Sequence, residues 1–400
     1  MNSLEYQNDK LVFDQLSLQD ISKDITTPFY LYSENLIKKN IKEYISHATG
    51  ETLFCYSVKA NSNLSILKLI AAEGMGFDVV SKGELYRVIK SGADPKKVVY
   101  SGVGKTKSEI RYALENNILC FNVESEGELL AINEEASYLS VTANISIRVN
   151  PDVAVESHPY ISTGMKDNKF GITYNNALAL YIKASKLSSL NIIGIDFHIG
   201  SQITSIQPYL DSIKSVRSLV SELKKENINI THIDVGGGLG ISYEDEDIVS
   251  RGDYIKEITN SLKDLNLTIL FEPGRSVIGD CGLLVTKLQY IKESETKNFM
   301  IVDASMSELL RPPLYDAFHK ITPVIKRNTN YKTYDIVGPV CESADFLGKE
   351  RLMNSEVDDF LVIEDVGAYG FVLSSNYNLS LIHISEPTRR YAISYAVFCL

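Results

Sequence analysis

The chain has 400 residues, of which 44% are hydrophobic and 23% are charged, as in an ordinary globular protein with two domains or one large barrel and an appendage. Its net charge of −11 argues against a general nucleic-acid binder and against binding to an anionic membrane surface. No apolar run approaches the roughly 20 residues that cross a bilayer. The five cysteines form no CxxC pair and no metal-ligand spacing, and the polar first ten residues do not predict a signal peptide. We therefore expect a cytoplasmic protein that binds no metal.

Short β-rich runs alternate with amphipathic helical stretches in the first two thirds of the chain. The eight β-rich runs are 54–59, 76–81, 97–102, 119–123, 144–150, 192–199, 232–236 and 268–272. Apolar residues recur at helical spacing between them, most clearly at 65–73, 177–187 and 208–226. Strands that alternate with helices predict parallel pairing, and eight such units are what a (β/α)8 TIM barrel requires. An open doubly wound sheet is the alternative that counting does not exclude.

Polar, charged or glycine residues fall at the carboxyl end of every one of these runs. In chain order they are Lys59, Asp78, Ser101-Gly102, Glu124, Arg148, His198, Gly236-Gly237-Gly238 and Glu272. Barrel enzymes place their chemistry on the face where the carboxyl ends of the strands meet. Any one of these residues alone is more simply a strand cap, but eight in succession favour an active site.

After residue 275 the pattern changes to strands with short connections. We predict strands at 283–290, 298–302, 333–337 and 359–363, and a short helix within 308–320. The sequence thus predicts an α/β protein with a barrel over 27–275 and a mostly antiparallel β domain built from 276–378 and 1–26. The stretch 379–389 resembles the translation of a common sequencing-library adapter, so we predict that 379–400 is a non-native tail; the alternative is a divergent C-terminal strand.

The strand-end residues suggest a particular cofactor. Lys59 ends a buried strand, where an ammonium is costly to desolvate, and a neutral amine is the form that condenses with a carbonyl. Gly236-Gly237-Gly238 and the turn at 272–275 can direct backbone N–H groups at a phosphate. Glu272 can face a pyridine nitrogen, and His198 can lie flat against a ring. Pyridoxal 5′-phosphate needs all four features, although alone Glu272 reads as an ion-pair partner and His198 as a core residue.

Several longer motifs carry a resemblance to a known family. They are YSVKAN at 56–61, GFDVVSKGE at 76–84, HPYISTG at 158–164, KFG at 169–171, HIGSQ at 198–202, EPGR at 272–275, RP at 311–312, CESAD at 341–345 and VGAYG at 366–370. On these motifs, from about residue 27 to residue 378, the chain resembles the diaminopimelate decarboxylases. These are fold-type III pyridoxal-phosphate enzymes, which also include ornithine and arginine decarboxylases. The resemblance implies the same barrel and β domain, and pyridoxal 5′-phosphate as cofactor.

The resemblance also implies roles for the matching residues. Lys59 would bind the cofactor covalently, His198 would stack on its ring and Glu272 would pair with its pyridinium. The implied phosphate-binding residues are Ser201, Gly236, Gly237, Gly238, Gly274 and Arg275, with Tyr369 nearby. The residues implied near the lysine and the ring are Asp78, Glu84 and Arg148. The implied substrate-binding residues are Arg275, Arg311, Tyr315, Glu342 and Tyr369. Cys341 would be the proton donor and would reach into the active site of the other subunit, which implies a homodimer.

The choice of substrate has a physical argument as well. Diaminopimelate carries an ammonium and a carboxylate at its distal end, whereas ornithine carries only the ammonium. Arg311 can grip a carboxylate with two N–H groups, and Glu342 can take the ammonium. The sequence therefore predicts decarboxylation of meso-2,6-diaminopimelate to L-lysine and carbon dioxide. The alternatives are a decarboxylase of another basic or carrier-bound amino acid, a racemase, or a non-catalytic pyridoxal-phosphate-binding protein.

Overall fold

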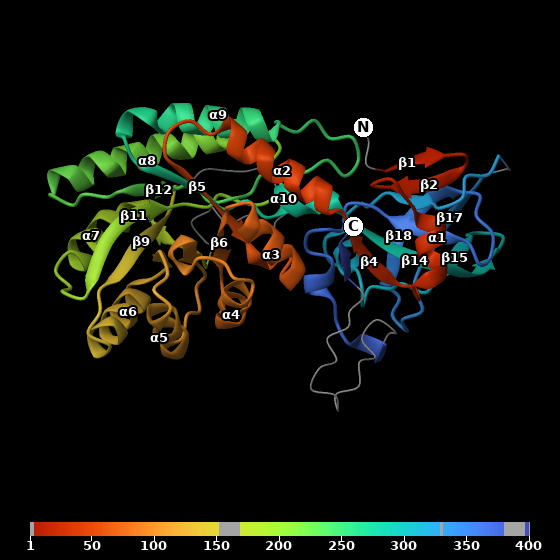
Figure 1. Cartoon of the computed structure of the whole chain (residues 1–400), viewed down its shortest axis with the longest axis horizontal. Coiled ribbons are helices and arrows are strands. Elements are labelled where there is room, and N and C mark those ends of the chain that lie inside the picture. Colours follow the sequence, from red (N-terminus) through yellow and green to blue (C-terminus); the bar gives the residue numbers. More distant parts are fainter. Residues whose placement is uncertain (1–3, 152–168, 329–330, 380–396, 400) are drawn as a thin grey trace. The chain divides into compact units, whose positions relative to one another are not determined.

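We describe the chain from a computed structural model that covers residues 4–151, 169–328, 331–379 and 397–399. The chain packs as two compact units (Figure 1). The barrel unit comprises Asn40–Ile241 and Asp247–Val277, and the β unit comprises Met1–Lys39, Ser242–Glu246 and Ile278–Leu400. The HPYISTG motif at 158–164 and most of the predicted tail lie outside the described residues.

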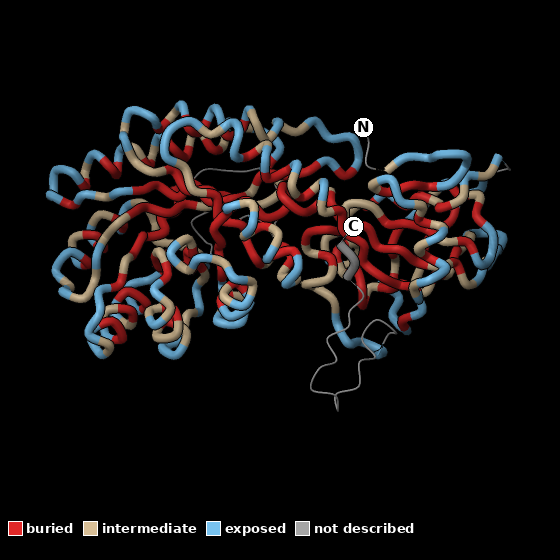
Figure 2. The backbone as a smooth tube through the Cα atoms, viewed as in Figure 1, coloured by how far each residue is buried: buried red, intermediate tan, exposed pale blue. Residues whose placement is uncertain are grey.

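Eight parallel strands of the barrel unit close on themselves, which confirms the predicted barrel over the open sheet. In chain order they are β5 (Thr52–Ser57), β6 (Gly76–Val79), β7 (Val98–Tyr100), β8 (Cys120–Val123), β9 (Ala143–Asn150), β11 (Leu190–Asp196), β12 (His232–Asp234) and β13 (Thr268–Phe271). Each pairs in parallel with the next, and β13 pairs with β5 to complete the ring. A two-residue strand, β10 (Ile172–Thr173), extends the sheet beside β9. The strands are buried along most of their length because helices cover the outside of the barrel (Figures 1 and 2).

Helices follow most of the barrel strands, as the periodicity predicts. The α-helices are α2 (Glu34–His47), α3 (Leu64–Ala72), α4 (Lys82–Lys90), α5 (Lys107–Glu115), α6 (Glu126–Tyr138), α7 (Tyr174–Ala184), α8 (Gln207–Lys225), α9 (Arg251–Leu262) and α10 (Arg275–Ile278). Short polar side chains cap several of their first turns; Thr106 and Glu109 form a complete capping box at α5. Short 3-10 turns occur at Val58–Ala60, Pro95–Lys97, Lys263–Leu265 and Gly279–Cys281. No helix within the described ranges is both long enough and apolar enough to span a membrane.

The β unit contains a mostly antiparallel sheet in the order β16-β19-β14-β15-β17-β18. Its strands are β14 (Gly282–Lys292), β15 (Phe299–Val302), β16 (Ile321–Pro323), β17 (Lys332–Val337), β18 (Phe346–Met353) and β19 (Phe360–Ile363). The four strands that the sequence predicts are confirmed as β14, β15, β17 and β19. The sequence analysis missed β16, which has three residues, and β18, whose middle is charged and exposed. The predicted short helix is α11 (Arg311–Tyr315), and the chain continues through Phe371–Leu373 and Tyr377–Leu379 as 3-10 turns.

Residues 4–32 also belong to the β unit. They form a small sheet of β1 (Leu4–Gln7), β2 (Lys10–Phe13) and β3 (Leu16–Ser17), followed by the helix α1 (Leu18–Asp24). Residues 29–32, which we expected to lead into the barrel, form β4 (Phe29–Tyr32), which pairs antiparallel with β14. β20 (Val397–Cys399) pairs in parallel with β4. β4 belongs to the β unit because its apolar side chains are buried there. Phe29 of β4 and Phe13 of β2 pack in one cluster with Leu283 and Val285 of β14.

Candidate active site

Lys59 lies just beyond β5, in the 3-10 turn Val58–Ala60. Its Nζ is 2.8 Å from Oδ2 of Asp78, which is fully buried at the end of β6, and Oγ of Ser57 is 3.0 Å from the same oxygen. The two carboxyl ends meet because β5 and β6 are adjacent parallel strands. The Lys59 side chain is 36% exposed, so its ammonium has both a counterion and access to solvent. The expectation of a desolvated amine is therefore corrected.

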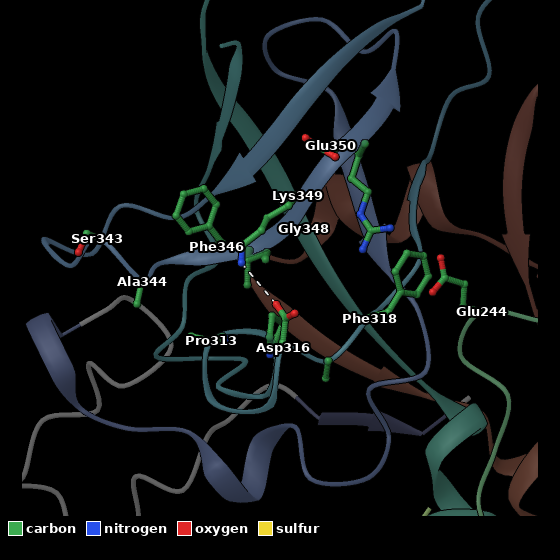
Figure 3. Close-up of a pocket in the computed structure, with 14 residues that line it drawn as sticks. Glu244, Pro313, Asp316, Phe318, Ser343, Ala344, Phe346, Gly348, Lys349 and Glu350 are labelled. Atoms are coloured by element: carbon green, nitrogen blue, oxygen red, sulfur yellow. Dashed lines mark hydrogen bonds and ion pairs between the residues drawn. The ribbon is translucent and has the colours of Figure 1, made fainter. Parts of the chain in front are cut away.

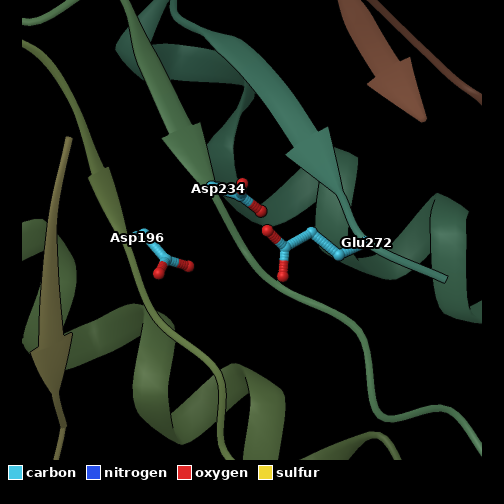
Figure 4. A group of neighbouring side chains, drawn as sticks. All are labelled: Asp196, Asp234 and Glu272. Atoms are coloured by element: carbon cyan, nitrogen blue, oxygen red, sulfur yellow. The ribbon is translucent and has the colours of Figure 1, made fainter. Parts of the chain in front are cut away.

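Glu272 follows β13 and lies in a cluster of three buried carboxylates (Figure 4). Oxygens of Asp196, Asp234 and Glu272 lie within 4.8 Å of one another, because β11, β12 and β13 are neighbours in the barrel. Burial, together with the charges of Asp234 and Asp78, raises the pKa of Glu272 well above its usual range. Burial likewise raises the pKa of Asp234 to about 6. Such a cluster favours a proton or a cationic partner, since either relieves the repulsion between the carboxylates.

Two neutral side chains from neighbouring strands orient the Glu272 carboxylate. Ser101 Oγ and Asn122 Nδ2 each donate to Glu272 Oε1 at 3.3 Å, and Asn122 Nδ2 is 3.1 Å from Ser101 Oγ. The sequence analysis identified Ser101 as a strand-end residue but missed Asn122, Asp196 and Asp234. These three lie in or at the end of buried strands, where a lone polar residue is not distinguished from an ordinary β residue. Only their convergence in the closed barrel marks them.

Arg148, at β9, provides a buried positive charge on the same face. Its Nη1 is 2.8 Å from Glu124 Oε1 and its Nε is 4.0 Å from Asp196 Oδ2. Glu124 also accepts hydrogen bonds from the backbone N–H groups of Gly102 at 3.1 Å and Gly171 at 2.7 Å. The Glu124 carboxylate thus ties the loops after β7 and β9 to the Arg148 guanidinium. Arg148 is thus placed among acidic residues, and its role near the lysine and the ring stays a prediction.

The glycine triplet follows β12 and lies against His198. The backbone N–H of Gly237 donates to His198 Nδ1 at 3.2 Å, so this nitrogen is unprotonated. Burial, with the nearby charges of Arg148 and Lys59, lowers the pKa of His198 well below its usual range, which keeps the ring neutral. A Cβ on Gly237 would lie 2.1 Å from the Glu272 carbonyl oxygen. The triplet therefore needs glycine for the close approach of two strand ends. The N–H of Gly236 donates to Asp234 Oδ1 at 2.9 Å, so the turn is also fixed by its own strand.

A second turn, at Gly274-Arg275, lies beside the lysine turn. The N–H of Ser57 donates to the Pro273 carbonyl at 3.0 Å, and a Cβ on Gly274 would lie 3.1 Å from the Cβ atoms of Ser57 and Ala60. Arg275, which is buried and begins α10, donates from Nη2 to Ser201 Oγ at 3.1 Å. The structure thus brings together the predicted barrel residues Lys59, Asp78, Arg148, His198, Ser201, Gly236, Gly237, Gly238, Glu272, Gly274 and Arg275.

Glu84, also predicted to lie near the lysine, is in α4 of the barrel unit and accepts a hydrogen bond from the Val80 N–H at 2.8 Å. The remaining predicted site residues, Arg311, Tyr315, Cys341, Glu342 and Tyr369, lie in the β unit. Arg311 is buried at the start of α11, and Tyr315 is partly buried at its end. Cys341 and Glu342 are exposed in the loop between β17 and β18. Tyr369 is partly buried after β19 and has a positive φ of 56°, a strained value for a residue other than glycine. Such strain is common at functional sites.

Asp345, which lies within the CESAD motif but was given no role, fixes the loop that carries Cys341. Its carboxylate accepts hydrogen bonds from the N–H groups of Met306 at 2.6 Å and Val340 at 2.9 Å. Burial raises the pKa of Asp345 to about 6. The backbone N–H of Asp345 donates to the Glu342 carbonyl at 3.1 Å, so the turn is closed on both sides. The Asp345 carboxylate therefore ties the two ends of the loop to each other and to Met306.

A cavity of about 610 Å³ lies in the β unit beside these segments (Figure 3). Its lining includes Pro312, which follows Arg311, and Ser343, which follows Glu342. Figure 3 shows Lys349 from β18 reaching toward Asp316, and their charged atoms are 3.4 Å apart. Two of the segments predicted to bind substrate therefore border the same hollow.

Comparison with known proteins identifies the family. Residues 34–279 match the family described as "Pyridoxal-dependent decarboxylase, pyridoxal binding domain". The chain is 47% identical over 382 residues to the diaminopimelate decarboxylase of Vibrio cholerae, and 46% identical over 379 residues to that of Pseudomonas aeruginosa. Each alignment covers 94% of this chain and 91% of the relative. The crystal structure of diaminopimelate decarboxylase from Helicobacter pylori complexed with L-lysine matches with a TM-score of 0.87 and 42% identity, over 90% of this chain and 91% of that chain.

This match places the chain, with its closed barrel and the lysine, glycine triplet and buried carboxylate at the strand ends, in the pyridoxal-phosphate class of enzymes. The chain belongs to the pyridoxal-dependent decarboxylase family. Family membership confirms the predicted fold, cofactor and carboxy-lyase class. It favours a decarboxylase over the two alternatives, a racemase and a non-catalytic pyridoxal-phosphate-binding protein.

Proposed function

We propose that this chain removes carbon dioxide from meso-2,6-diaminopimelate to give L-lysine, the last step of lysine biosynthesis, in the cytoplasm. The observation that carries the proposal is the convergence of Lys59, Glu272 and Gly236–Gly238 on the adjoining strand ends of β5, β13 and β12. It occurs in a chain 46–47% identical to diaminopimelate decarboxylases over nearly its whole length. Decarboxylases of other basic amino acids are the second candidate, and Arg311 argues against them.

The residues of the barrel unit fit pyridoxal 5′-phosphate. Lys59 would hold it covalently, and Ser201, Gly236, Gly237, Gly238, Gly274 and Arg275 would hold its phosphate. The tight approach of Gly237 to the Glu272 carbonyl supports the need for glycine in this turn, because a side chain there would push the ends of β12 and β13 apart. His198, being neutral, would lie against the ring without adding charge. Glu272 would face the ring nitrogen, and the repulsion within its carboxylate cluster favours a cationic N–H there.

When bound, the cofactor supplies a ring that accepts the electron pair left behind as carbon dioxide departs. Glu272 would hold a proton on the ring nitrogen, which would maintain that capacity. Asp78 serves as the counterion of the Lys59 ammonium at 2.8 Å and would hold the lysine near the reacting centre. Arg148 balances the charge of the acidic residues around it.

The β unit would recognise the distal end of the substrate. Arg311 would grip the distal carboxylate, and Glu342 would bind the ammonium. Tyr315 and Tyr369 would complete the substrate contacts. Cys341 would deliver the proton that replaces the departing carboxylate, and its exposure in a fixed loop is compatible with serving a second subunit. We propose a homodimer with shared active sites for this reason.

A substrate panel tests the proposal. Purified enzyme, loaded with pyridoxal 5′-phosphate, is supplied in turn with meso-diaminopimelate, ornithine, arginine and lysine, and both carbon dioxide and the amine product are measured. We expect release of lysine and carbon dioxide in equal amounts from diaminopimelate, with kcat/KM for the other substrates lower by at least about 100-fold. A preference for ornithine or arginine would refute the substrate assignment but leave the decarboxylase class intact. Sedimentation of the same preparation tests the homodimer.

A further inference from the structure

Arg311 is held by two residues of the β unit to which the sequence analysis assigned no role. Arg311 is 6% exposed and His319 is fully buried, and Nη1 of the arginine lies 2.8 Å from Nε2 of the histidine. Tyr243 covers the guanidinium, with its ring centroid 4.7 Å from Arg311 Cζ. The rings of Tyr243 and His319 also meet edge to face, with centroids 5.3 Å apart and an interplanar angle of 81°. The three side chains therefore form one packed group.

The contacts of His319 fix its protonation state. A guanidinium has only N–H donors, so Nε2 of His319 must accept the hydrogen bond from Arg311 and cannot carry a proton. On the other side, Nδ1 lies 2.8 Å from the Glu364 carbonyl oxygen, which only accepts, so Nδ1 carries the proton. The imidazole is therefore neutral and has one defined tautomer. A charged imidazolium would place an N–H group against the guanidinium.

The surrounding backbone holds this histidine in place. α11 ends at Tyr315, and the next residue, Asp316, lies in the left-handed region with φ of 51°. The chain therefore turns back, and the Ala317 N–H donates to the Arg311 carbonyl at 3.4 Å. Arg351 of β18 donates from Nη2 to the His319 carbonyl at 3.2 Å, and its guanidinium carbon lies 3.7 Å from the centroid of the Phe318 ring. The acceptor that His319 presents to Arg311 is thus fixed by contacts from β18 and from the carbonyl of Glu364.

A neutral acceptor has a specific consequence for a guanidinium that must bind a substrate. It uses one of the five N–H groups and sets the plane of the fork, yet it leaves the positive charge of Arg311 intact. A carboxylate in the place of His319 would orient the arginine equally well but would neutralise it. Orientation without neutralisation is what the recognition of a second carboxylate requires.

We propose that His319 and Tyr243 are positioning residues that set the Arg311 guanidinium for the distal carboxylate of the substrate. The inference rests on the proposed function and adds the residues that determine carboxylate specificity. It predicts that disturbing either residue weakens ligands that carry this carboxylate and spares ligands that lack it.

The test compares two inhibitors of diaminopimelate decarboxylation. L-Lysine keeps the distal amino-acid group, whereas cadaverine has the same two amines and no carboxylate. His319→Phe keeps a ring beside Tyr243 but removes the acceptor, and we expect it to raise Ki for L-lysine about tenfold or more, with Ki for cadaverine unchanged. His319→Gln is the matched control, because its amide oxygen can replace Nε2 as acceptor, and it should stay close to wild type.

Tyr243→Leu provides a second route should His319→Phe fail to fold, because it removes the ring over the guanidinium without touching the hydrogen bond. The same selective loss of lysine inhibition is expected. Three results would overturn the inference. They are equal inhibition of the wild type by both compounds, no change of either Ki in the variants, and a similar change of both Ki values in the variants. Absence of diaminopimelate decarboxylation by wild type would instead overturn the proposed function.

Discussion

Replacing Gly237 with alanine should damage the phosphate cradle more than the space of one methyl group suggests. The added Cβ would lie 2.1 Å from the Glu272 carbonyl oxygen and 3.1 Å from its carbon. Contacts below 3.0 Å are not tolerated, so the two strand ends must separate by roughly 1 Å. Overpacking of this kind costs about 1–3 kcal/mol, which corresponds to about a 5- to 150-fold loss if it falls on the bound state. The backbone N–H bonded to His198 would move with Gly237.

The assay measures urea unfolding of the cofactor-free protein and the Kd for pyridoxal 5′-phosphate by absorbance titration. Gly127→Ala is the matched control, because Gly127 lies within α6 and a Cβ added there would meet nothing within 4 Å, so alanine should stabilise the helix by about 0.5–1 kcal/mol. We expect Gly237→Ala to lower stability, raise Kd, or do both. If Gly237→Ala matches Gly127→Ala in stability and in Kd, the close approach of β12 and β13 does not matter and the reasoning is refuted.

Three further predictions concern buried or reactive charges. Arg148→Met should destabilise the protein by about 3–5 kcal/mol in urea unfolding, because it leaves Glu124 buried without its partner, and adding Glu124→Gln should recover part of the loss. Burial raises the pKa of Glu84 from 4.5 to about 7, so its folded form holds a proton more tightly and stability should fall as pH rises from 4.5 to 7. Glu84→Gln keeps the oxygen acceptor for the Val80 N–H and should remove about 2 kcal/mol of that fall between pH 4.5 and 7, whereas an unchanged slope would count against it. Cys341→Ala should lower kcat about 100-fold or more with cofactor binding unchanged, and near-normal kcat would exclude it as the proton donor.

The barrel was predictable because its strands are short apolar runs separated by clear helical periodicity. Lys59 and Glu272 were recognisable because each is the last residue of such a run, and closing the ring then brings them to one face. β18 was not predictable, since Lys349 and Glu350 interrupt its apolar pattern with exposed charges. The pairing of β4 with β14 joins segments far apart in the chain, and no local pattern encodes such a contact.

The supporting residues of the site were harder to predict than its reactive ones. Asp196 and Asp234 lie within buried strands, and only the register of three adjacent strands places them beside Glu272. His319 lies in an irregular segment. One of the groups it contacts is the backbone carbonyl of Glu364, and a backbone contact does not depend on the residue type, so the sequence gives no sign of it. Residues predicted to contact the cofactor or the substrate lie in recognisable sequence motifs. Residues that only position them were identified from the structure alone.

The most direct test of the account is to locate the covalent bond to the cofactor. Enzyme loaded with pyridoxal 5′-phosphate is reduced with borohydride, digested and mapped by mass spectrometry, with Lys59→Arg as the matched variant. The account predicts that the modified peptide contains Lys59 and that the modification disappears in the variant together with decarboxylation. Modification of a different lysine, or decarboxylation that survives in Lys59→Arg, would contradict it.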